Sequence, residues 1–149
     1  MKIEILTHSA EETMAFGKAI SMLAKPGSVF CLTGDLGAGK TTLVRGIARG
    51  LNIKSVVQSP TFNIMKIYFD GNRPLIHIDA YRLADVDTDI GLDEYIGYET
   101  GLTVIEWPNF IEKLIPQNSS EIEIINMGEN DRKITIESED NAFLEGLKK

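Results

Sequence analysis

The strongest chemical signal in the sequence is a glycine-rich segment at residues 34–41, which reads GDLGAGKT. Its spacing matches the P-loop pattern GxxxxGK followed by Ser or Thr, with one glycine more than the pattern needs. Glycines let backbone N–H groups converge on an anion without obstruction by a Cβ atom, and a helix start adds unpaired donors and partial positive charge. Phosphate is therefore the natural ligand of this loop.

The side chains that follow the loop glycines have distinct expected roles. Lys40 would bridge terminal phosphates as a point charge, and the Thr41 hydroxyl would coordinate Mg²⁺, while Thr42 would add an α-phosphate contact. The alternative is a glycine turn that only joins a strand to a helix. However, an apolar strand pattern precedes the loop and an amphipathic helix pattern follows it, as phosphate binding requires. The sequence thus predicts a nucleoside triphosphate site.

Two acidic residues are candidates to complete a magnesium site. Asp79 and Glu106 each end an apolar run, and a P-loop needs an acid at the end of a nearby strand to hold Mg²⁺ or its waters. A solvated strand end is the alternative for each. Period-two alternation places His77 on the same strand face as Asp79, where it would orient that acid, although a lone strand histidine is more often structural. The choice between the two acids stays open at this stage.

Three further residues near these positions allow two interpretations each. Thr61 lies in a polar break before a strand, which is typical of a switch segment that senses the γ-phosphate, but also of an ordinary turn. Trp107 directly follows Glu106, and packing at the strand end is favoured over nucleotide contact. Cys31 alternates with apolar neighbours, so a buried small side chain is favoured over a nucleophile.

Hydrophobic periodicity predicts the elements that would position these residues. Strand patterns occur at residues 2–6, 28–33, 62–69, 75–79, 102–106, 121–127 and 133–138. Helices are expected from the capping box at Ser9 to Lys25, from the loop to a left-handed stop at Gly50, and at residues 108–115 and 141–149. Residues 85–99 are acidic and loop-like. Crossovers combined with hairpins predict an α/β protein of the P-loop NTPase-like, three-layer kind, with a mixed central sheet and flanking helices.

Composition limits the class of protein. A chain of 149 residues without repeats or long linkers predicts one domain over residues 1–149. A net charge of -7 repels polyanions, so direct nucleic-acid binding is not expected. No apolar run reaches the about 20 residues of a membrane span, and no signal-peptide pattern is visible, so a cytoplasmic location is expected. One cysteine and two distant histidines indicate neither a disulfide scaffold nor a structural zinc site.

Four short segments together form a specific pattern: residues 34–42, 59–62, 77–83 and 105–108, which read GDLGAGKTT, SPTF, HIDAYRL and IEWP. In order and spacing they resemble the bacterial TsaE family, small ATPases of the tRNA threonylcarbamoyladenosine pathway. The resemblance implies an ATPase that uses ATP and Mg²⁺ and works with the TsaB and TsaD proteins. The TsaB–TsaD complex would transfer the threonylcarbamoyl group to the adenosine beside the anticodon.

The resemblance also implies roles for individual residues. Glu106 would be the Walker B acid, Asp79 would lie near the γ-phosphate, and both would join Lys40 as catalytic residues and Thr41 as metal ligands. The implied nucleotide-binding residues are Thr7, Asp35, Leu36, Gly37, Ala38, Gly39, Lys40, Thr41, Thr42, Thr61 and Arg132. Among these, Thr7 would lie on the adenine side. Asn109 stands where many relatives carry an acid, so position 109 receives no role.

Two other functions fit a P-loop in a chain of this size. A small-molecule kinase usually supplies several lid arginines, whereas the five arginines here form no such cluster in the sequence. A GTPase switch normally carries NKxD and DxxG motifs, and neither occurs. Hydrolysis by the isolated chain is expected to be slow, because neither an arginine finger nor a clear water-positioning glutamine is recognisable, Gln58 being a weak candidate.

Overall fold

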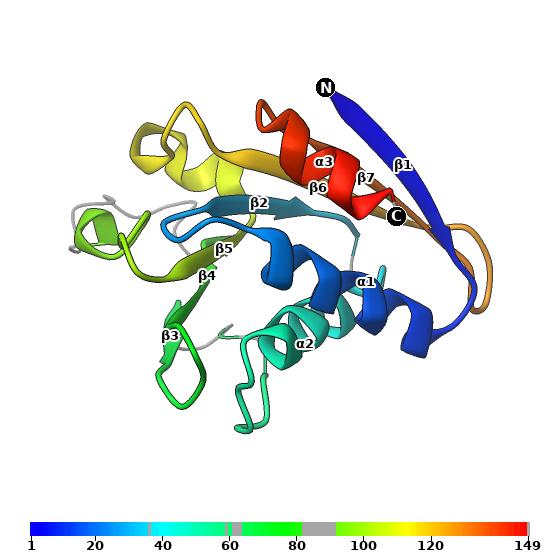
Figure 1. Cartoon of the computed structure of the whole chain (residues 1–149), viewed down its shortest axis with the longest axis horizontal. Helices are drawn as coiled ribbons and strands as arrows, with labels where there is room; N and C mark the ends of the chain where they lie inside the picture. Colours follow the sequence, from blue (N-terminus) through cyan, green and yellow to red (C-terminus); the bar gives the residue numbers. More distant parts are fainter. Residues whose placement is uncertain (36, 59, 61–63, 82–91, 149) are drawn as a thin grey trace.

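A computed structural model describes residues 1–35, 37–58, 60, 64–81 and 92–148. Its described strands form one seven-stranded sheet in the order β1-β7-β6-β2-β5-β4-β3 (Figure 1). The strands are β1 (Lys2–Thr7), β2 (Val29–Thr33), β3 (Met65–Tyr68), β4 (Leu75–Asp79), β5 (Leu102–Glu106), β6 (Ser120–Asn126) and β7 (Arg132–Glu137). The α-helices are α1 (Ala10–Leu23), α2 (Lys40–Gly50) and α3 (Asn141–Leu147), and the 3-10 helices are η2 (Leu92–Glu94) and η3 (Pro108–Leu114).

The sheet is mixed, as the sequence predicts. Strand β2 runs parallel to β5 and β6, and β4 runs parallel to β5, whereas β3–β4, β6–β7 and β1–β7 are antiparallel pairs. Within the parallel part, Glu106 is the register partner of Leu32 on one side and of Asp79 on the other. The carboxyl ends of β2, β5 and β4 therefore meet at one edge of the sheet, where the glycine loop begins.

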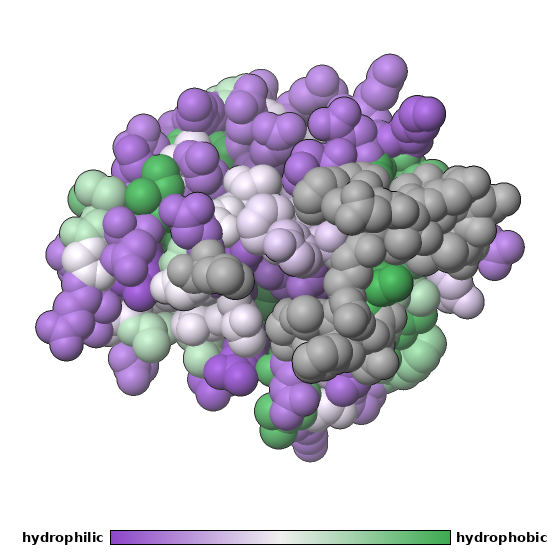
Figure 2. Space-filling model, turned by 180° about the vertical axis from the view of Figure 1, so that it is seen from behind, coloured by the Kyte–Doolittle hydropathy of each residue, from purple (hydrophilic) through white to green (hydrophobic). Residues whose placement is uncertain are grey.

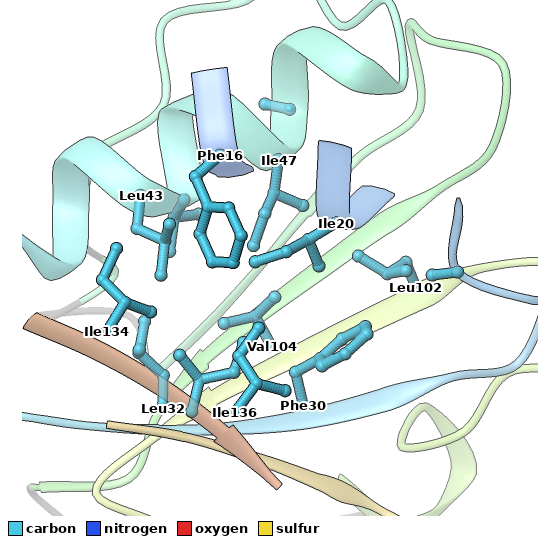
Figure 3. Close-up of a cluster of buried hydrophobic side chains, with 14 of the residues drawn as sticks. Phe16, Ile20, Phe30, Leu32, Leu43, Ile47, Leu102, Val104, Ile134 and Ile136 are labelled. Atoms are coloured by element: carbon cyan, nitrogen blue, oxygen red, sulfur yellow. The ribbon is translucent and has the colours of Figure 1, made fainter. Parts of the chain in front are cut away.

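The larger hydrophobic core lies between the sheet and the three α-helices. Alternation along β2 and β5 turns Phe30 and Val104 toward this core, and Leu144 of α3 joins them. The centre of the cluster is shown in Figure 3 with Phe16, Ile20, Phe30, Leu32, Leu43, Ile47, Leu102, Val104, Ile134 and Ile136. In β4, the residues on the same face are Leu75, His77 and Asp79. The alternation thus places the candidate acids on the helix side of the sheet.

A smaller apolar cluster covers the opposite face of the parallel strands. It contains Ile76, Ile78, Ile105 and Ile111, the last contributed by η3. This second layer makes the fold three-layered over its parallel part. Seen from behind the view of Figure 1, the described surface is mainly hydrophilic, with apolar residues in small separate groups (Figure 2). Such scattered exposed apolar residues are normal and by themselves indicate no docking surface.

Helices α1 and α2 pack so closely that glycine is required between them. A Cβ atom on Gly46 would collide with the carbonyl oxygen of Met14, and one on Gly50 would collide with Ser21 Oγ. The prediction that Gly50 provides a left-handed helix stop is wrong, because Gly50 is the last helical residue and the positive φ, 60°, occurs at Asn52. Gly50 is thus explained by close approach to α1 rather than by backbone conformation.

Several predicted elements differ in length or type from the observed ones. Strand β3 begins at Met65, because Ile64 has φ of 65°, while residues 62–63 of the predicted strand lie outside the described residues. The helix predicted at 108–115 is the 3-10 helix η3, which has Pro108 at its start and is interrupted at Ile111 by φ of -134°. Of the acidic stretch 85–99, the described part contains only the short helix η2. No described helix has the length and apolar character needed to span a membrane.

Candidate active site

The glycine loop joins the carboxyl end of β2 to the first residue of α2. Gly37 and Gly39 have φ of 78° and 105°, a left-handed region that favours glycine. The Ala38 N–H donates to the Asp35 carbonyl oxygen at 3.0 Å, which closes the turn. Gly39 is the N-cap of α2, and no side chain caps this helix. An uncapped helix start with converging backbone donors fits a phosphate group, so the local geometry suits the predicted ligand.

Lys40, the loop lysine, lies against the end of β5. Its Nζ is 3.8 Å from Glu106 Oε1 and 4.6 Å from the ring centroid of Trp107. Lys40 and Glu106 are only 8% and 4% exposed. Charged groups that are this deeply buried are normally paired. Here the Glu106 carboxylate and the face of the Trp107 ring both stabilise the Lys40 ammonium group. The Trp107 ring is also 5.1 Å from that of Tyr81, so this tryptophan forms one wall of the lysine site.

Asp79 and Glu106 stand side by side at the ends of adjacent parallel strands. Both are almost fully buried, with Asp79 5% exposed. Asp79 Oδ1 accepts a hydrogen bond from the Tyr81 N–H at 3.0 Å, which fixes the carboxylate against the backbone that leaves β4. Two carboxylates beside the glycine loop match the ligand chemistry that Mg²⁺ prefers. The geometry keeps both acids as candidates for the magnesium site.

His77 contacts Glu106 rather than the acid on its own strand. Its Nε2 lies 2.6 Å from Glu106 Oε2, and the imidazole is completely buried. Residues two apart on a strand are separated by about 6.5 Å, whereas neighbouring strands lie about 4.8 Å apart, so the cross-strand acid is easier to reach. The alternation correctly predicts the face of His77, but the option that His77 orients Asp79 is wrong for the observed hydrogen bond, which goes to Glu106. The missing information was the pairing of β4 with β5.

Arg132 of β7 braces the glycine loop from the antiparallel part of the sheet. Its Nε donates to the Ala38 carbonyl oxygen at 2.8 Å, and its Nη1 donates to the carbonyl oxygens of Gly128 and Asp131 at 3.1 and 2.9 Å. The guanidinium therefore ties the β6–β7 turn to the loop. The sequence signal for Arg132 was only the family resemblance, because no local pattern marks this contact.

A small cavity of about 80 Å³ adjoins the loop and the start of α1. It is lined by Ser9, Ala10, Thr13, Gly39, Thr42, Glu129, Asn130 and Arg132. Thr7 is buried behind this cavity, where its Oγ1 is 2.7 Å from Thr13 Oγ1, and its register partner on β7 is Arg132. The structure thus brings Thr7, Thr42 and Arg132 to the same side of the loop.

The remaining predicted residues divide into described and undescribed positions. Thr41 and Thr42 lie in the first turn of α2 with partly exposed side chains, and Asp35 is exposed to solvent on the loop. Leu36 and Thr61 lie outside the described residues.

Cys31 is 5% exposed, and burial raises the pKa of its thiol to about 11. A thiol with this pKa is protonated at neutral pH, which confirms the interpretation of Cys31 as a buried small side chain.

A larger cavity, of about 490 Å³, lies away from the loop near the amino-terminal end of β2. Four of the polar side chains around it form two pairs. Lys25 Nζ is 3.3 Å from Asp140 Oδ2, and Ser120 Oγ donates to Ser138 Oγ at 2.9 Å. Because a binding site needs polar groups available to a ligand, the smaller region around the loop is the better candidate site.

A glycine loop between a parallel strand and a helix, with acids at the ends of neighbouring strands, defines a P-loop NTPase-like α/β protein. The family model described as "Threonylcarbamoyl adenosine biosynthesis protein TsaE" matches residues 7–134. The chain therefore belongs to the TsaE family.

Individual relatives agree with this assignment. The tRNA threonylcarbamoyladenosine biosynthesis protein TsaE of Bacillus subtilis is 46% identical over 137 residues, which covers 92% of this chain and 86% of that protein. The protein of the same name from Treponema pallidum is 38% identical and covers 88% of this chain and 97% of that protein. The crystal structure of Bacillus subtilis YdiB matches with a TM-score of 0.83 at 39% identity, over 99% of this chain and 93% of that one. The predicted family and fold class are both confirmed.

Proposed function

We propose that this chain is a slow, Mg²⁺-dependent ATPase that serves tRNA threonylcarbamoyladenosine biosynthesis by acting on a TsaB–TsaD complex. The observation that carries the proposal is the convergence of Lys40 and Glu106. A loop lysine at the start of α2 and an acid at the end of β5 come from distant parts of the sequence, yet Nζ and Oε1 are 3.8 Å apart. Membership of the TsaE family supports a role in tRNA threonylcarbamoyladenosine biosynthesis. The geometry of Lys40 and Glu106 supports a role in ATP binding and hydrolysis.

The candidate site residues have separate expected roles. The N–H groups around Gly37 and Gly39 would hold the phosphates, and Lys40 would neutralise their charge. The Thr41 hydroxyl, with Glu106 and Asp79, would hold magnesium and its waters, and a bound magnesium ion supplies charge neutralisation at the β and γ oxygens. Thr7 and Arg132 would define the adenine side. Thr61 would act in a switch segment, as the family resemblance implies.

The arginine contacts in the described part of the chain support slow hydrolysis. Arg132 is the described arginine at the loop, and its Nε and Nη1 already donate to backbone carbonyl oxygens. Its hydrogen bonds thus favour a bracing role over stabilisation of a transferred phosphoryl group. A rapid ATPase normally supplies a free guanidinium for that purpose. We therefore expect this protein to act on its partners through the nucleotide that it has bound, ATP or ADP, rather than through fast ATP turnover.

The charge of the chain supports a role through protein partners. With a net charge of -7, the protein repels tRNA, so a partner must bind the RNA. A nucleotide-dependent change can act on that partner only if the ATP and ADP states have different affinities for it. The proposal therefore assigns tRNA binding and group transfer to TsaB–TsaD, and assigns the nucleotide-driven reset to this chain.

The test compares ATP binding and turnover for the wild type and for Lys40→Ala. Trp107 is the only tryptophan and lies 4.6 Å from Lys40 Nζ, so its emission reports on nucleotide at the loop. We expect Lys40→Ala to weaken ATP binding on the order of 100-fold, since charge-assisted hydrogen bonds to phosphate are lost. Lys18→Ala, which removes an exposed lysine from α1, is the matched control and should bind normally.

A second assay measures formation of modified tRNA by TsaB–TsaD over several turnovers. The wild-type chain with ATP and Mg²⁺ should sustain repeated turnover, and Lys40→Ala should not. Full multiple-turnover activity of TsaB–TsaD in the absence of this chain would refute the accessory role. ATP binding to Lys40→Ala at wild-type strength would refute the placement of the nucleotide.

A further inference from the structure

A buried histidine occupies the strand beside the candidate catalytic acid. His77 is 0% exposed, and its Nε2 lies 2.6 Å from Glu106 Oε2. Carboxylate oxygens are hydrogen-bond acceptors, so we assign the hydrogen of this contact to Nε2, which donates it. The other nitrogen, Nδ1, is buried and has no hydrogen-bond partner in the described part of the chain. A buried polar atom without a partner is costly, so packing alone does not account for histidine at this position.

The two oxygens of the Glu106 carboxylate have different neighbours. Oε2 receives the short hydrogen bond from His77, whereas Oε1 lies 3.8 Å from the Nζ of Lys40. One oxygen is therefore anchored on β4 and the other is directed to the phosphate loop. Without the anchor, the carboxylate would be free to rotate about its last single bond and to turn either oxygen toward the loop.

We propose that His77 is a positioning residue: its Nε2–H holds the Glu106 carboxylate so that Oε1 remains directed at Lys40 and the phosphate loop. The role rests on the proposed ATPase function, in which Glu106 is the acid that serves hydrolysis. Functional carboxylates must be held within about 0.5 Å of their working geometry, and outer hydrogen-bond partners are a common way to achieve this. In the described part of the chain, the hydrogen bond of His77 goes to Glu106, so His77 would act through that acid.

The kinetic test compares His77→Leu with His77→Gln. Leucine fills a similar volume without a donor, whereas the glutamine amide places an N–H near the position of Nε2. We expect His77→Leu to lower kcat for ATP hydrolysis about 10- to 100-fold, the usual loss for an outer hydrogen-bond partner, while the ATP Kd from Trp107 emission changes less than about threefold. His77→Gln should recover most of the lost kcat. A purely structural histidine predicts instead that both variants lose thermal stability and activity together.

A spectroscopic test needs no turnover. The chain has two histidines, His8 and His77, so ¹⁵N-labelled imidazole signals are simple to assign. In the nucleotide-free protein, the Nε2–H proton of His77 should give a slowly exchanging downfield NMR signal that is absent from His77→Gln. Glu106→Gln should move this signal upfield, because a neutral amide is a weaker acceptor than a carboxylate. An unchanged signal in Glu106→Gln would refute the hydrogen bond on which the proposal depends.

The outcomes separate this inference from the proposed function. If the wild type binds and hydrolyses ATP and His77→Leu keeps its kcat within about twofold, the positioning role is wrong and the proposed function stands. If His77→Gln loses as much kcat as His77→Leu, the donor is not what matters, and the role is again wrong. A wild type that neither binds nor hydrolyses ATP overturns the proposed function first. Should His77→Leu fail to fold, His77→Gln and the NMR signal decide the matter.

Discussion

The parallel and antiparallel parts of the sheet contribute to the candidate site in different ways. The parallel strands β2, β5 and β4 end together and supply the loop, Glu106 and Asp79. The antiparallel strand β7, which pairs with β6 and β1, supplies Arg132, which contacts the backbone of the loop rather than another functional side chain. The groups that would act on the phosphates and the metal ion thus come from the parallel part. The antiparallel part holds the loop in shape.

The difference follows from strand geometry. Parallel strands direct their carboxyl ends to one edge, so chemically active residues at several strand ends converge without special loops. Antiparallel strands alternate in direction, and a hairpin brings a turn rather than several strand ends to that edge. The turn between β6 and β7 accordingly contributes backbone carbonyl oxygens and one bracing guanidinium.

The largest effect is expected from an acid at a parallel strand end. Glu106→Ala should lower kcat for ATP hydrolysis by about 100-fold or more, the range for losing a group that handles the proton or water in the reaction. The ATP Kd should change much less, because the loop and Lys40 remain. The measurement is steady-state hydrolysis with TsaB–TsaD, together with Trp107 emission for binding.

The matched control is an acid at the end of an antiparallel strand. Glu137 closes β7 and is exposed. Glu137→Ala should leave both kcat and Kd unchanged. Loss of ATP affinity with intact turnover in Glu106→Ala, or a large kinetic effect in Glu137→Ala, would contradict the division between the two parts of the sheet.

The next effect concerns stability, and it contrasts two helical glycines. Gly46→Ala places a Cβ against the Met14 carbonyl oxygen, and α1 must move away, so the free energy of unfolding should fall by about 1–3 kcal/mol. Gly146→Ala in α3 meets the flexible end of Leu23 instead, at 3.1 Å. There the better helix propensity of alanine, about 1 kcal/mol, should offset the contact.

Urea denaturation followed by circular dichroism measures both glycine variants. Equal destabilisation of the two would show that helix packing beside the parallel strands is not specially tight. Stabilisation of Gly46→Ala would show that α1 and α2 separate more easily than the observed contact indicates.

A smaller effect is expected when the brace from the antiparallel part is removed. Arg132→Ala eliminates the 2.8 Å hydrogen bond to the Ala38 carbonyl oxygen, so the loop becomes less ordered before ATP binds. We expect about tenfold weaker ATP binding, equivalent to about 1.4 kcal/mol, with kcat at saturating ATP close to the wild-type value. Arg49→Ala, on the exposed side of α2, is the control and should bind ATP normally. A kcat loss as large as that of Glu106→Ala would instead make Arg132 a catalytic group.

The smallest effect is a pH dependence at the edge of the antiparallel part. His8 Nδ1 is 3.0 Å from Asp131 Oδ1, and this hydrogen bond and the aspartate charge raise the pKa of His8 above its ordinary 6.5. A raised folded-state pKa means that the stabilisation is fully present below pH 6.5 and is lost as the pH rises through the folded value. NMR titration of the His8 ring should show the raised pKa, and Asp131→Asn should lower it. A His8 pKa at or below 6.5 in the wild type would refute the contact.

Features encoded by neighbouring residues could be predicted from the sequence. The glycine loop, the two strand-end acids, both hairpins and the helix start at Ser9 depend on residues close together in the chain, and the structure contains all of them. Of the capping box, the Ser9 half forms, whereas the Glu12 carboxylate accepts from the His8 N–H instead of the Ser9 N–H. The pair His77–Glu106 spans 29 positions and the pair Arg132–Ala38 spans 94. Such contacts depend on strand order, which local patterns do not specify. The wrong prediction at Gly50 has the same origin, because the close contact that requires glycine there is with α1, which is distant in the sequence.

The central claim is that the loop between β2 and α2 holds the phosphates of a magnesium-bound adenine nucleotide. Its most direct test is a crystal structure grown with Mg²⁺ and a non-hydrolysable ATP analogue. Phosphate oxygens should lie within hydrogen-bond distance of the loop N–H groups and of Lys40 Nζ. An analogue bound at another place, with the loop empty at saturating concentration, would contradict the account.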